Sequence, residues 1–246
     1  MITGNKSFAF LPYYHMTVPA IQCQTTRHNN NEAHITMTEK CYLTSRALQG
    51  TATVLECRPA EDGRYAVILD KTLFHPQGGG QPGDTGTLGD ATVIHTAFMP
   101  EGIIHYTDIP VAPGEVQMNV DAEKRQLHSR LHTGGHLLSH VMETFGWKPT
   151  KGHHWPDEGR IQYIPAGSPV IVDPEDVRRH CQALIDADHS CHHYQDEDGM
   201  FQIRFADFEP YSCGGTHVQS LGEIGTLVLK SVKTKKGVLS VQYDVI

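Results

Sequence analysis

The sequence has few features of a membrane or secreted protein. No stretch of its 246 residues approaches the run of about 20 apolar residues that a membrane-spanning helix requires, which argues against such a helix. The six cysteines are scattered, without a secretory signal or the spacing of a disulfide framework, so we expect a protein of the reducing cytoplasm. Positive charge is also scarce. The 20 lysines and arginines are outnumbered by 28 acids, and the net charge of −8 argues against a broadly basic nucleic-acid coat but allows a local basic groove.

Composition divides the chain into three parts. Residues 1–36 are polar and have little periodicity, which favours a disordered extension over an arginine-rich, amphipathic transit peptide. Residues 37–113 alternate short β-rich runs with glycine, proline or acidic turns, and this predicts a small β-barrel-like domain. Residues 114–246 contain both helical and strand patterns, so we expect an α+β fold in total. The strands expected in the β-rich part are Ala52–Cys57, Tyr65–Leu69, Gly86–Leu88, Ala91–His95 and Ile103–Thr107.

The C-terminal part is expected to place long helices on a mostly antiparallel sheet. Asp121 is a suitable cap for a helix that runs to about Phe145, with Gly146 ending it. A second helix is expected to begin near Pro174 and to cover residues 177–187. The strands expected around these helices are Gly159–Ile164, Val170–Val172, Met200–Phe205, Gly225–Val232 and Val238–Val245.

Two short pairs of residues have the side chains that a zinc ion binds. His132 and His136 lie one helical turn apart and project from one side of the helix, and Cys213 and His217 flank a glycine turn in Cys-Gly-Gly-Thr-His. Seventeen histidines make one such pair weak evidence, but both pairs together predict one zinc ion per chain. Three ligands would leave a position for water, whereas four would close the site, and the sequence does not decide between them. A nucleophilic pair of Cys213 with His132 or His217 remains a minority alternative.

Glycines mark two further places of interest. Gly134 and Gly135 interrupt the helix between the two histidines at a cost of about 1 kcal/mol each, which indicates that something packs or binds closely there. The segment Phe74–Gly86 is glycine-rich but lacks the Gly-Lys-Ser/Thr ending of a phosphate-binding loop. It is either a plain mobile hairpin loop or a loop whose exposed backbone lets a polymeric ligand approach.

These motifs resemble those of the alanyl-tRNA editing protein (AlaX) family, whose editing domain is shared with alanyl-tRNA synthetase. The similarity lies in residues 130–138, 213–218 and 222–225, and the segment 74–86 is similar to the glycine-rich motif of the longer members. The pieces occur in the expected order between residues 40 and 246. Two departures stand out: Gly134 and Gly135 replace larger residues, which implies a looser pocket, and Leu221 stands where a threonine is common.

The resemblance implies a zinc-dependent hydrolase that contributes to translation fidelity by deacylating seryl- or glycyl-tRNA(Ala) in trans. The implied zinc ligands are His132, His136, Cys213 and His217. We expect Thr133 to sense the serine hydroxyl, although bonding back to its own helix is an equally good explanation of that threonine. We also expect Gln77, Gly78, Gly79, Gly80 and Gln81 to bind the acceptor end of the tRNA substrate.

Several questions stay open. Editing of seryl-tRNA(Thr) is a close alternative, because threonyl-tRNA synthetase has an editing domain with similar paired motifs. A zinc-stabilised RNA-binding module without catalysis is the alternative from another class. The candidates for contact with tRNA phosphates are Lys148, Lys151, Arg160, Lys230, Lys233, Lys235 and Lys236.

Overall fold

The computed structural model describes residues 38–246, so the predicted extension 1–36 lies outside the described residues. The described part contains fifteen strands and two α-helices, and it has the α+β composition that the sequence predicted. Neither helix in this part of the chain has both the length and the apolar character needed to cross a membrane.

The first half of the described chain forms a closed barrel of six antiparallel strands. In order around the barrel these are β2 (Gln49–Pro59), β3 (Tyr65–Leu69), β7 (Gly102–Thr107), β6 (Ala91–Met99), β5 (Gly86–Leu88) and β8 (Gly114–Val120). The barrel therefore extends past residue 113, where we had placed its end. Its last strand was missed although Val116, Met118 and Val120 alternate with more exposed residues and are buried in the barrel core. Beside the barrel, β1 (Glu39–Lys40) pairs in parallel with β4 (Lys71–Thr72).

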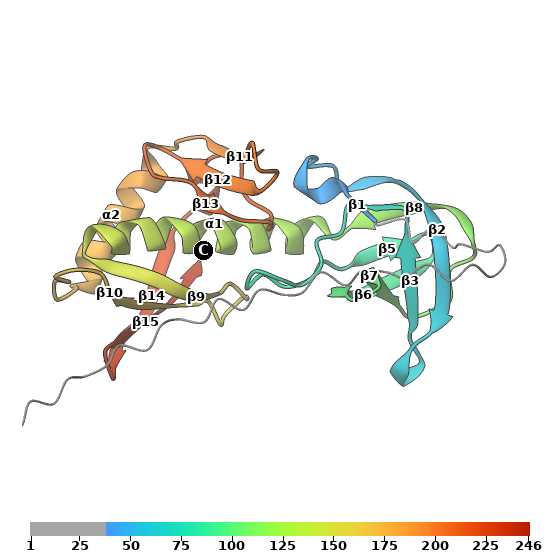
Figure 1. Ribbon diagram of the computed structural model, residues 1–246, viewed down its shortest axis with the longest axis horizontal. Coiled ribbons are helices and arrows are strands. Elements are labelled where there is room, and N and C mark those ends of the chain that lie inside the picture. The colour runs from blue at the N-terminus through green and yellow to red at the C-terminus, as the bar shows by residue number, and fades with distance from the viewer. Residues whose placement is uncertain (1–37) are drawn as a thin grey trace, which may run out of the picture. The chain divides into compact units, whose positions relative to one another are not determined.

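The second half surrounds one long helix, α1 (Ala122–Thr144), which lies between two sheets (Figure 1). The lower, four-stranded sheet has the order β14 (Leu227–Lys235), β15 (Val238–Val245), β10 (Arg160–Pro165) and β9 (Trp147–His153). The upper, three-stranded sheet consists of β11 (Cys191–Gln195), β12 (Phe201–Phe205) and β13 (Tyr211–Ser212). The other helix, α2 (Pro174–Asp186), has 13 residues, so only one of the two predicted helices is long.

Both helices begin where the sequence predicted. The Asp121 carboxylate accepts a hydrogen bond from the Lys124 backbone N–H at 3.1 Å, and Asp173 caps α2 in the same manner. Gly146 takes a positive φ of 78° directly after α1, as a glycine stop does. The strand predicted at residues 170–172 is wrong: this segment pairs with no strand among the described residues, and Ile171 is fully exposed.

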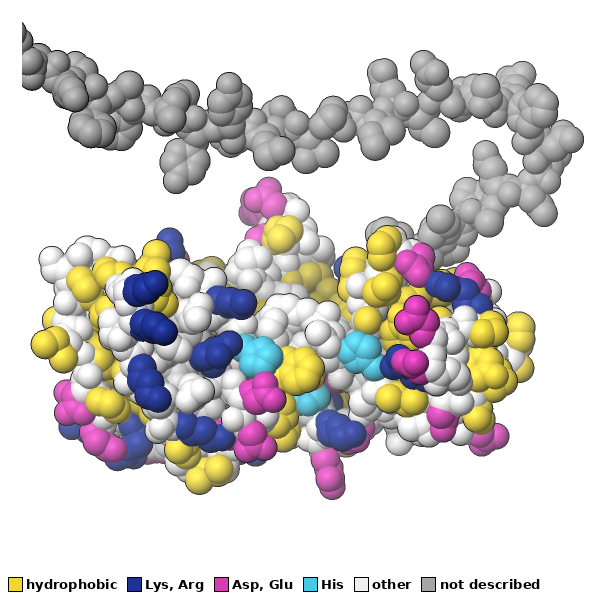
Figure 2. Space-filling view, turned by 90° about the horizontal axis from the view of Figure 1, so that it is seen from below, with side chains coloured by type: hydrophobic (Ala, Val, Ile, Leu, Met, Phe, Trp, Pro, Cys, Tyr) yellow, Lys and Arg dark blue, Asp and Glu magenta, His cyan; other side chains and the backbone are white. Residues whose placement is uncertain are grey.

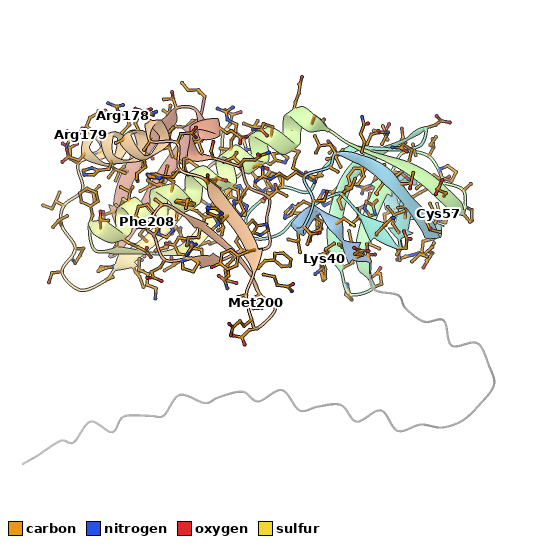
Figure 3. All side chains as sticks on the ribbon, turned by 90° about the horizontal axis from the view of Figure 1, so that it is seen from above. Lys40, Cys57, Arg178, Arg179, Met200 and Phe208 are labelled. Carbon is orange, nitrogen blue, oxygen red and sulfur yellow. The ribbon has the colours of Figure 1, made fainter. Side chains whose placement is uncertain are left out.

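The core around α1 holds the site in place. Leu131, Leu138 and Met142 are buried among side chains of both sheets, as their helical spacing predicted. The loop between β12 and β13 contacts α1 as well, because Phe208, which is labelled in Figure 3, stacks on the ring of His140 with centroids 4.6 Å apart. Residues on α1 are therefore fixed from above and below by packed rings and aliphatic side chains.

A buried ion pair attaches the glycine-rich loop to α1. The Arg125 guanidinium on α1 binds both carboxylate oxygens of Asp84, and it donates to the Leu73 carbonyl at 2.7 Å. Asp84 in turn accepts from the backbone N–H of His75 at 2.6 Å, which closes the loop on itself. A charge-assisted network of this kind is strong when it is completely satisfied. It places residues 75–83 directly beside the helix that carries His132.

Candidate metal centre

The four predicted ligands lie together. Their ligand atoms are all within 4.8 Å of one another, and the group could hold a metal ion. Cys213 Sγ is 3.2 Å from Nε2 of His217 and 3.5 Å from Nε2 of His132. Consecutive turns of α1 present His132 and His136, and the loop that follows β13 presents Cys213 and His217. The geometry thus unites two motifs separated by nearly eighty residues of sequence.

The glycine turn of the second motif fits against the first. A Cβ atom at Gly215 would overlap the ring of His132 and would lie 2.9 Å from Oε1 of Gln81. Gly214, in contrast, faces open space. The second glycine of Cys-Gly-Gly-Thr-His is therefore required by the close approach of the histidine, whereas the first is not required by packing.

Gln81 orients His132. Its Oε1 accepts from Nδ1 of His132 at 2.8 Å and from the backbone N–H of Thr216 at 2.9 Å, and its Nε2 donates to the Thr216 hydroxyl at 2.8 Å. With the Nδ1 proton directed at Gln81, the lone pair on Nε2 faces the other ligands. The Gln81 side chain is completely buried and positions His132, and the role in substrate binding that we expect of Gln81 stays a prediction.

Thr133 orients the ring of His217. Its hydroxyl donates to the Ser129 carbonyl at 2.8 Å, and Nδ1 of His217 lies 3.2 Å from it. Because the hydroxyl proton is already used, Nδ1 must be the donor, and Nε2 of His217 is left free toward Cys213. Thr133 is completely buried. Its hydroxyl bonds within its own helix, as the alternative explanation expects, and the sensing of a serine hydroxyl by Thr133 stays a prediction.

Burial keeps the three histidines of the metal-binding group neutral. It lowers the pKa of His136 to about 3 and the pKa values of His132 and His217 well below their usual range, with smaller contributions from neighbouring imidazoles. Neutral imidazole is the metal-binding form. Burial also raises the pKa of the Cys213 thiol to about 11, a cost that a bound cation would remove. Nε2 of His136 is buried without a partner among the described residues, as expected of an atom that faces an ion.

A fourth imidazole, which the sequence analysis missed, lies against the metal-binding group. His154 follows β9 and stacks on His132 at 4.6 Å between ring centroids. The hydroxyl of Tyr243 donates to the Leu131 carbonyl at 2.9 Å, so Nδ1 of His154, 2.5 Å away, must donate to that hydroxyl. Burial lowers the pKa of His154 to about 4, which keeps the ring neutral with Nε2 as its acceptor.

Gly135 makes room for that imidazole. A Cβ atom at this position would lie 2.5 Å from the ring of His154 and 2.7 Å from the Tyr243 oxygen. The sequence had indicated close packing at Gly134 and Gly135, and at Gly135 this is confirmed. The expected looser pocket is absent there, because His154 and Tyr243 occupy the space that a larger residue would take.

A cavity of about 560 Å³ opens beside the metal-binding group. His132, His136 and Cys213 line it, whereas His217 does not. Across the cavity lie residues of the β9 strand, the loop before Cys213 and the glycine-rich loop: Lys151, His154, Tyr211, Gly79 and Gly80. Cavities of this size accommodate small ligands or the end of a polymer.

The glycine-rich loop is held firmly at this cavity. Gly80 takes a φ of +79°, and a Cβ atom there would lie 2.6 Å from the Gly152 carbonyl oxygen. The Gly80 carbonyl accepts a hydrogen bond from the His154 backbone N–H at 2.8 Å. Gly79 lines the same cavity. Gln77 and Gly78 are exposed outside it, so the role in substrate binding that we expect of these residues stays a prediction.

Basic side chains gather on one face of the second half, over the four-stranded sheet (Figure 2). Histidine side chains also reach the surface in the middle of this view. Lys230 is partly neutralised, because it forms ion pairs with Asp244 and Asp157. Lys148, Lys151 and Arg160 are exposed on β9 and β10 and form no ion pair among the described residues. Of these three residues, Lys151 on β9 lines the metal-site cavity.

Sequence comparison identifies the relatives of this chain. No protein-family model matches it. The alanyl-tRNA editing protein AlaX-M of Pyrococcus horikoshii is 34% identical over 212 residues, which cover 78% of this chain and 89% of that protein. The alanyl-tRNA editing protein Aarsd1 of Bos taurus is 31% identical over 82% of this chain and 52% of its own length. An alanine–tRNA ligase of Pyrobaculum neutrophilum is 31% identical over 70% of this chain but only 23% of the ligase. The chain therefore belongs to the alanyl-tRNA editing protein family.

Proposed function

We propose that this protein is a trans-acting editing hydrolase that removes serine, and also glycine, from mischarged tRNA(Ala) in the cytoplasm. The single observation that carries the proposal is the group of three imidazoles and a thiol, two of them buried and two half-buried, of which three members line a cavity. The names of the relatives support tRNA(Ala) as the partner. A separate hydrolytic site is needed because the pocket of a synthetase that activates alanine cannot reject the smaller glycine. It also discriminates against serine, which adds a hydroxyl, only about a hundredfold.

The residues present fit one zinc ion. His132, His136, Cys213 and His217 would hold it through soft and borderline donors, and Gln81 and Thr133 fix two of these rings in the required tautomer. When bound, zinc supplies a Lewis acid that polarises a carbonyl or lowers the pKa of water. The reaction is hydrolysis of an ester: water adds its oxygen to the aminoacyl carbonyl carbon, the bond to the ribose oxygen breaks, and that oxygen takes up a proton.

The other cavity residues hold the substrate. The acceptor nitrogen of His154 belongs to a ring that lines the cavity and is fixed by Tyr243, so it suits a hydroxyl donor such as that of the seryl group. His154 is thus a candidate for serine recognition in addition to Thr133. Lys151 on β9 lines the same cavity and supplies a positive charge for a phosphate of the tRNA end. The backbone of Gly79 and Gly80 permits close approach of the terminal nucleotide.

Deacylation of a set of tRNAs tests this function. We expect hydrolysis of Ser-tRNA(Ala) and Gly-tRNA(Ala), little hydrolysis of Ala-tRNA(Ala), and loss of activity with a chelator that added zinc restores. Faster hydrolysis of Ser-tRNA(Thr) than of Ser-tRNA(Ala) would instead support the threonine system. Binding of tRNA and zinc without any deacylation would support the non-catalytic module.

A matched pair of cysteine variants locates the reaction. Cys213→Ala removes a metal donor, so we expect it to abolish deacylation and to lower the bound zinc per chain. Cys57→Ala is the control, since Cys57 lies on β2 of the barrel (Figure 3) and is not a member of the metal-binding group. Equal activity of the two variants, measured with no other hydrolase present, would refute the metal role of Cys213.

A further inference from the structure

A second cavity lies on the other side of the glycine-rich loop. Its volume is about 460 Å³, and residues of this loop form one wall: Gln77, Pro82 and Gly83. The metal-site cavity is lined by Gly79, Gly80 and His154, and the second cavity by the next residue along the chain, Trp155. The two cavities are therefore neighbours that share the loop and the segment after β9 as a partition.

The walls of the second cavity suit a flat ring. Trp155 is half-buried, and one of its faces stacks on His153 with ring centroids 5.4 Å apart and planes 11° apart. Glu158 holds His153 at 3.4 Å, which keeps the stacked pair together. Leu127 of α1 and Pro156 add apolar surface. Every nucleobase has a π face that stacks on an aromatic platform of this kind.

The same cavity contains an imidazole with an unpartnered nitrogen and a lysine at its rim. His128 of α1 lines it and is only 6% exposed, yet its Nδ1 has no hydrogen-bond partner among the described residues. Burial lowers the pKa of His128, so the ring is neutral and can bond to the edge of a base. Lys124, one turn earlier, lines the cavity as well, and its side chain is more than half exposed. Its ammonium group pairs with Asp121 at 3.4 Å and donates to the Thr85 hydroxyl at 3.2 Å, and the third of its three N–H donors remains for a phosphate at the rim.

We propose that this second cavity binds one nucleotide of the unpaired 3′ end of tRNA, with its base between Trp155 and Leu127 and its phosphate near Lys124. The proposal rests on the proposed function, which puts the terminal nucleotide and its ester in the metal-site cavity. The preceding nucleotides must then pass the glycine-rich loop. Apolar walls, an unpartnered buried imidazole and a rim cation match a nucleotide better than a peptide or a lipid, since only the nucleotide combines a stacking ring, a polar edge and an adjacent anion.

Direct binding tests the site without any catalysis. The chain has two tryptophans, and Trp147 is buried, so the ribotrinucleotide CpCpA is expected to quench mainly the fluorescence of Trp155. Trp155→Leu is expected to weaken CpCpA binding about 5- to 150-fold, the range for loss of one stacked base, whereas Trp155→Phe retains an aromatic face and much of the affinity. His128→Leu is expected to weaken binding as well. Affinity for cytidine monophosphate as high as for CpCpA, or equal affinity of the Leu and Phe variants, would overturn the proposal.

A second experiment compares two ester substrates. Seryl-adenosine reaches only the metal-site cavity, whereas a seryl ester of CpCpA reaches both. We expect Trp155→Leu to lower the ratio of kcat/KM for the longer ester to that for the shorter one by about 5- to 150-fold. An unchanged ratio would overturn the proposal. If neither ester is hydrolysed but CpCpA binding depends on Trp155, the nucleotide site stands and the proposed function fails.

Discussion

Adding one methyl group at either of two neighbouring glycines of α1 is expected to have opposite effects. In a helix interior, glycine is about 1 kcal/mol less favourable than alanine, so Gly→Ala normally stabilises. At Gly134 the nearest atom to a new Cβ would be a methyl group of Val245 at 3.4 Å, an ordinary contact. At Gly135 the new atom would lie 2.5 Å from His154 and 2.7 Å from the Tyr243 hydroxyl.

The magnitudes follow from these distances. His154 and Tyr243 are buried and bonded to each other, so neither ring can move freely. Overpacking of this kind costs about 1–3 kcal/mol, and a weakened buried hydrogen bond adds about 1 kcal/mol. After the helix-propensity gain, Gly135→Ala is expected to lower the free energy of unfolding by about 1–3 kcal/mol. Gly134→Ala is expected to raise it by up to about 1 kcal/mol.

Chemical unfolding of the zinc-loaded variants measures this difference, and deacylation of Ser-tRNA(Ala) measures its consequence for the site. Gly135→Ala displaces His154 and is expected to lower activity, while Gly134→Ala keeps it. The reasoning would be refuted if both variants had the same unfolding free energy, or if Gly135→Ala were the more stable of the two.

Three further predictions concern other buried polar groups. Gln81→Leu removes the acceptor that orients His132 and is expected to weaken zinc binding about 10- to 100-fold in competition with a chromophoric chelator; undiminished affinity would contradict this role. Tyr243→Phe removes the hydroxyl that fixes the tautomer of His154, so it is expected to lower kcat/KM more for Ser-tRNA(Ala) than for Gly-tRNA(Ala). An equal loss for both substrates would show that His154 does not recognise serine. In the barrel, burial lowers the pKa of His105 to about 4, below an unfolded value of about 6.5, so its neutral form stabilises the fold above pH 6.5 and this contribution is lost as the pH falls toward 4. When the pH is lowered from 7 to 4.5, the free energy of unfolding of His105→Gln is therefore expected to fall by about 2 kcal/mol less than that of the parent protein. An identical fall in the two proteins would contradict this role of His105.

Local patterns predicted much of this structure because they depend on residues close in sequence. The cap at Asp121, the stop at Gly146 and the pairing of His132 with His136 all follow from helix geometry. The Cys213 motif could be joined to them because few other functions explain a thiol beside a glycine turn. The strand β9 was missed because proline, glycine and lysines interrupt its pattern, and only its neighbour β10 makes it a strand.

The direction of a buried side chain could not be predicted in the same way. Thr133 and Gln81 have residue types that suit a substrate contact, but their partners are set by the docking of the loop around Gly215 and of the glycine-rich loop onto α1. His154 had no signal of its own. It pairs with Tyr243, which lies 89 positions further along the chain, and no local spacing links the two.

The glycines nevertheless contain that missing information. Gly80, Gly135 and Gly215 come from three different segments, and an added Cβ at each would meet His154 or His132. Each was noticed in the sequence for another reason: a flexible loop, a weakened helix and a tight turn. In the structure, the backbone at each of these glycines packs directly against His132 or His154, the two stacked imidazoles, where a side chain would not fit. A glycine that lies inside a helix, lowers its stability and forms no turn therefore indicates that another buried group packs against it. At Gly135 that group is the imidazole of His154, which sequence analysis alone did not find.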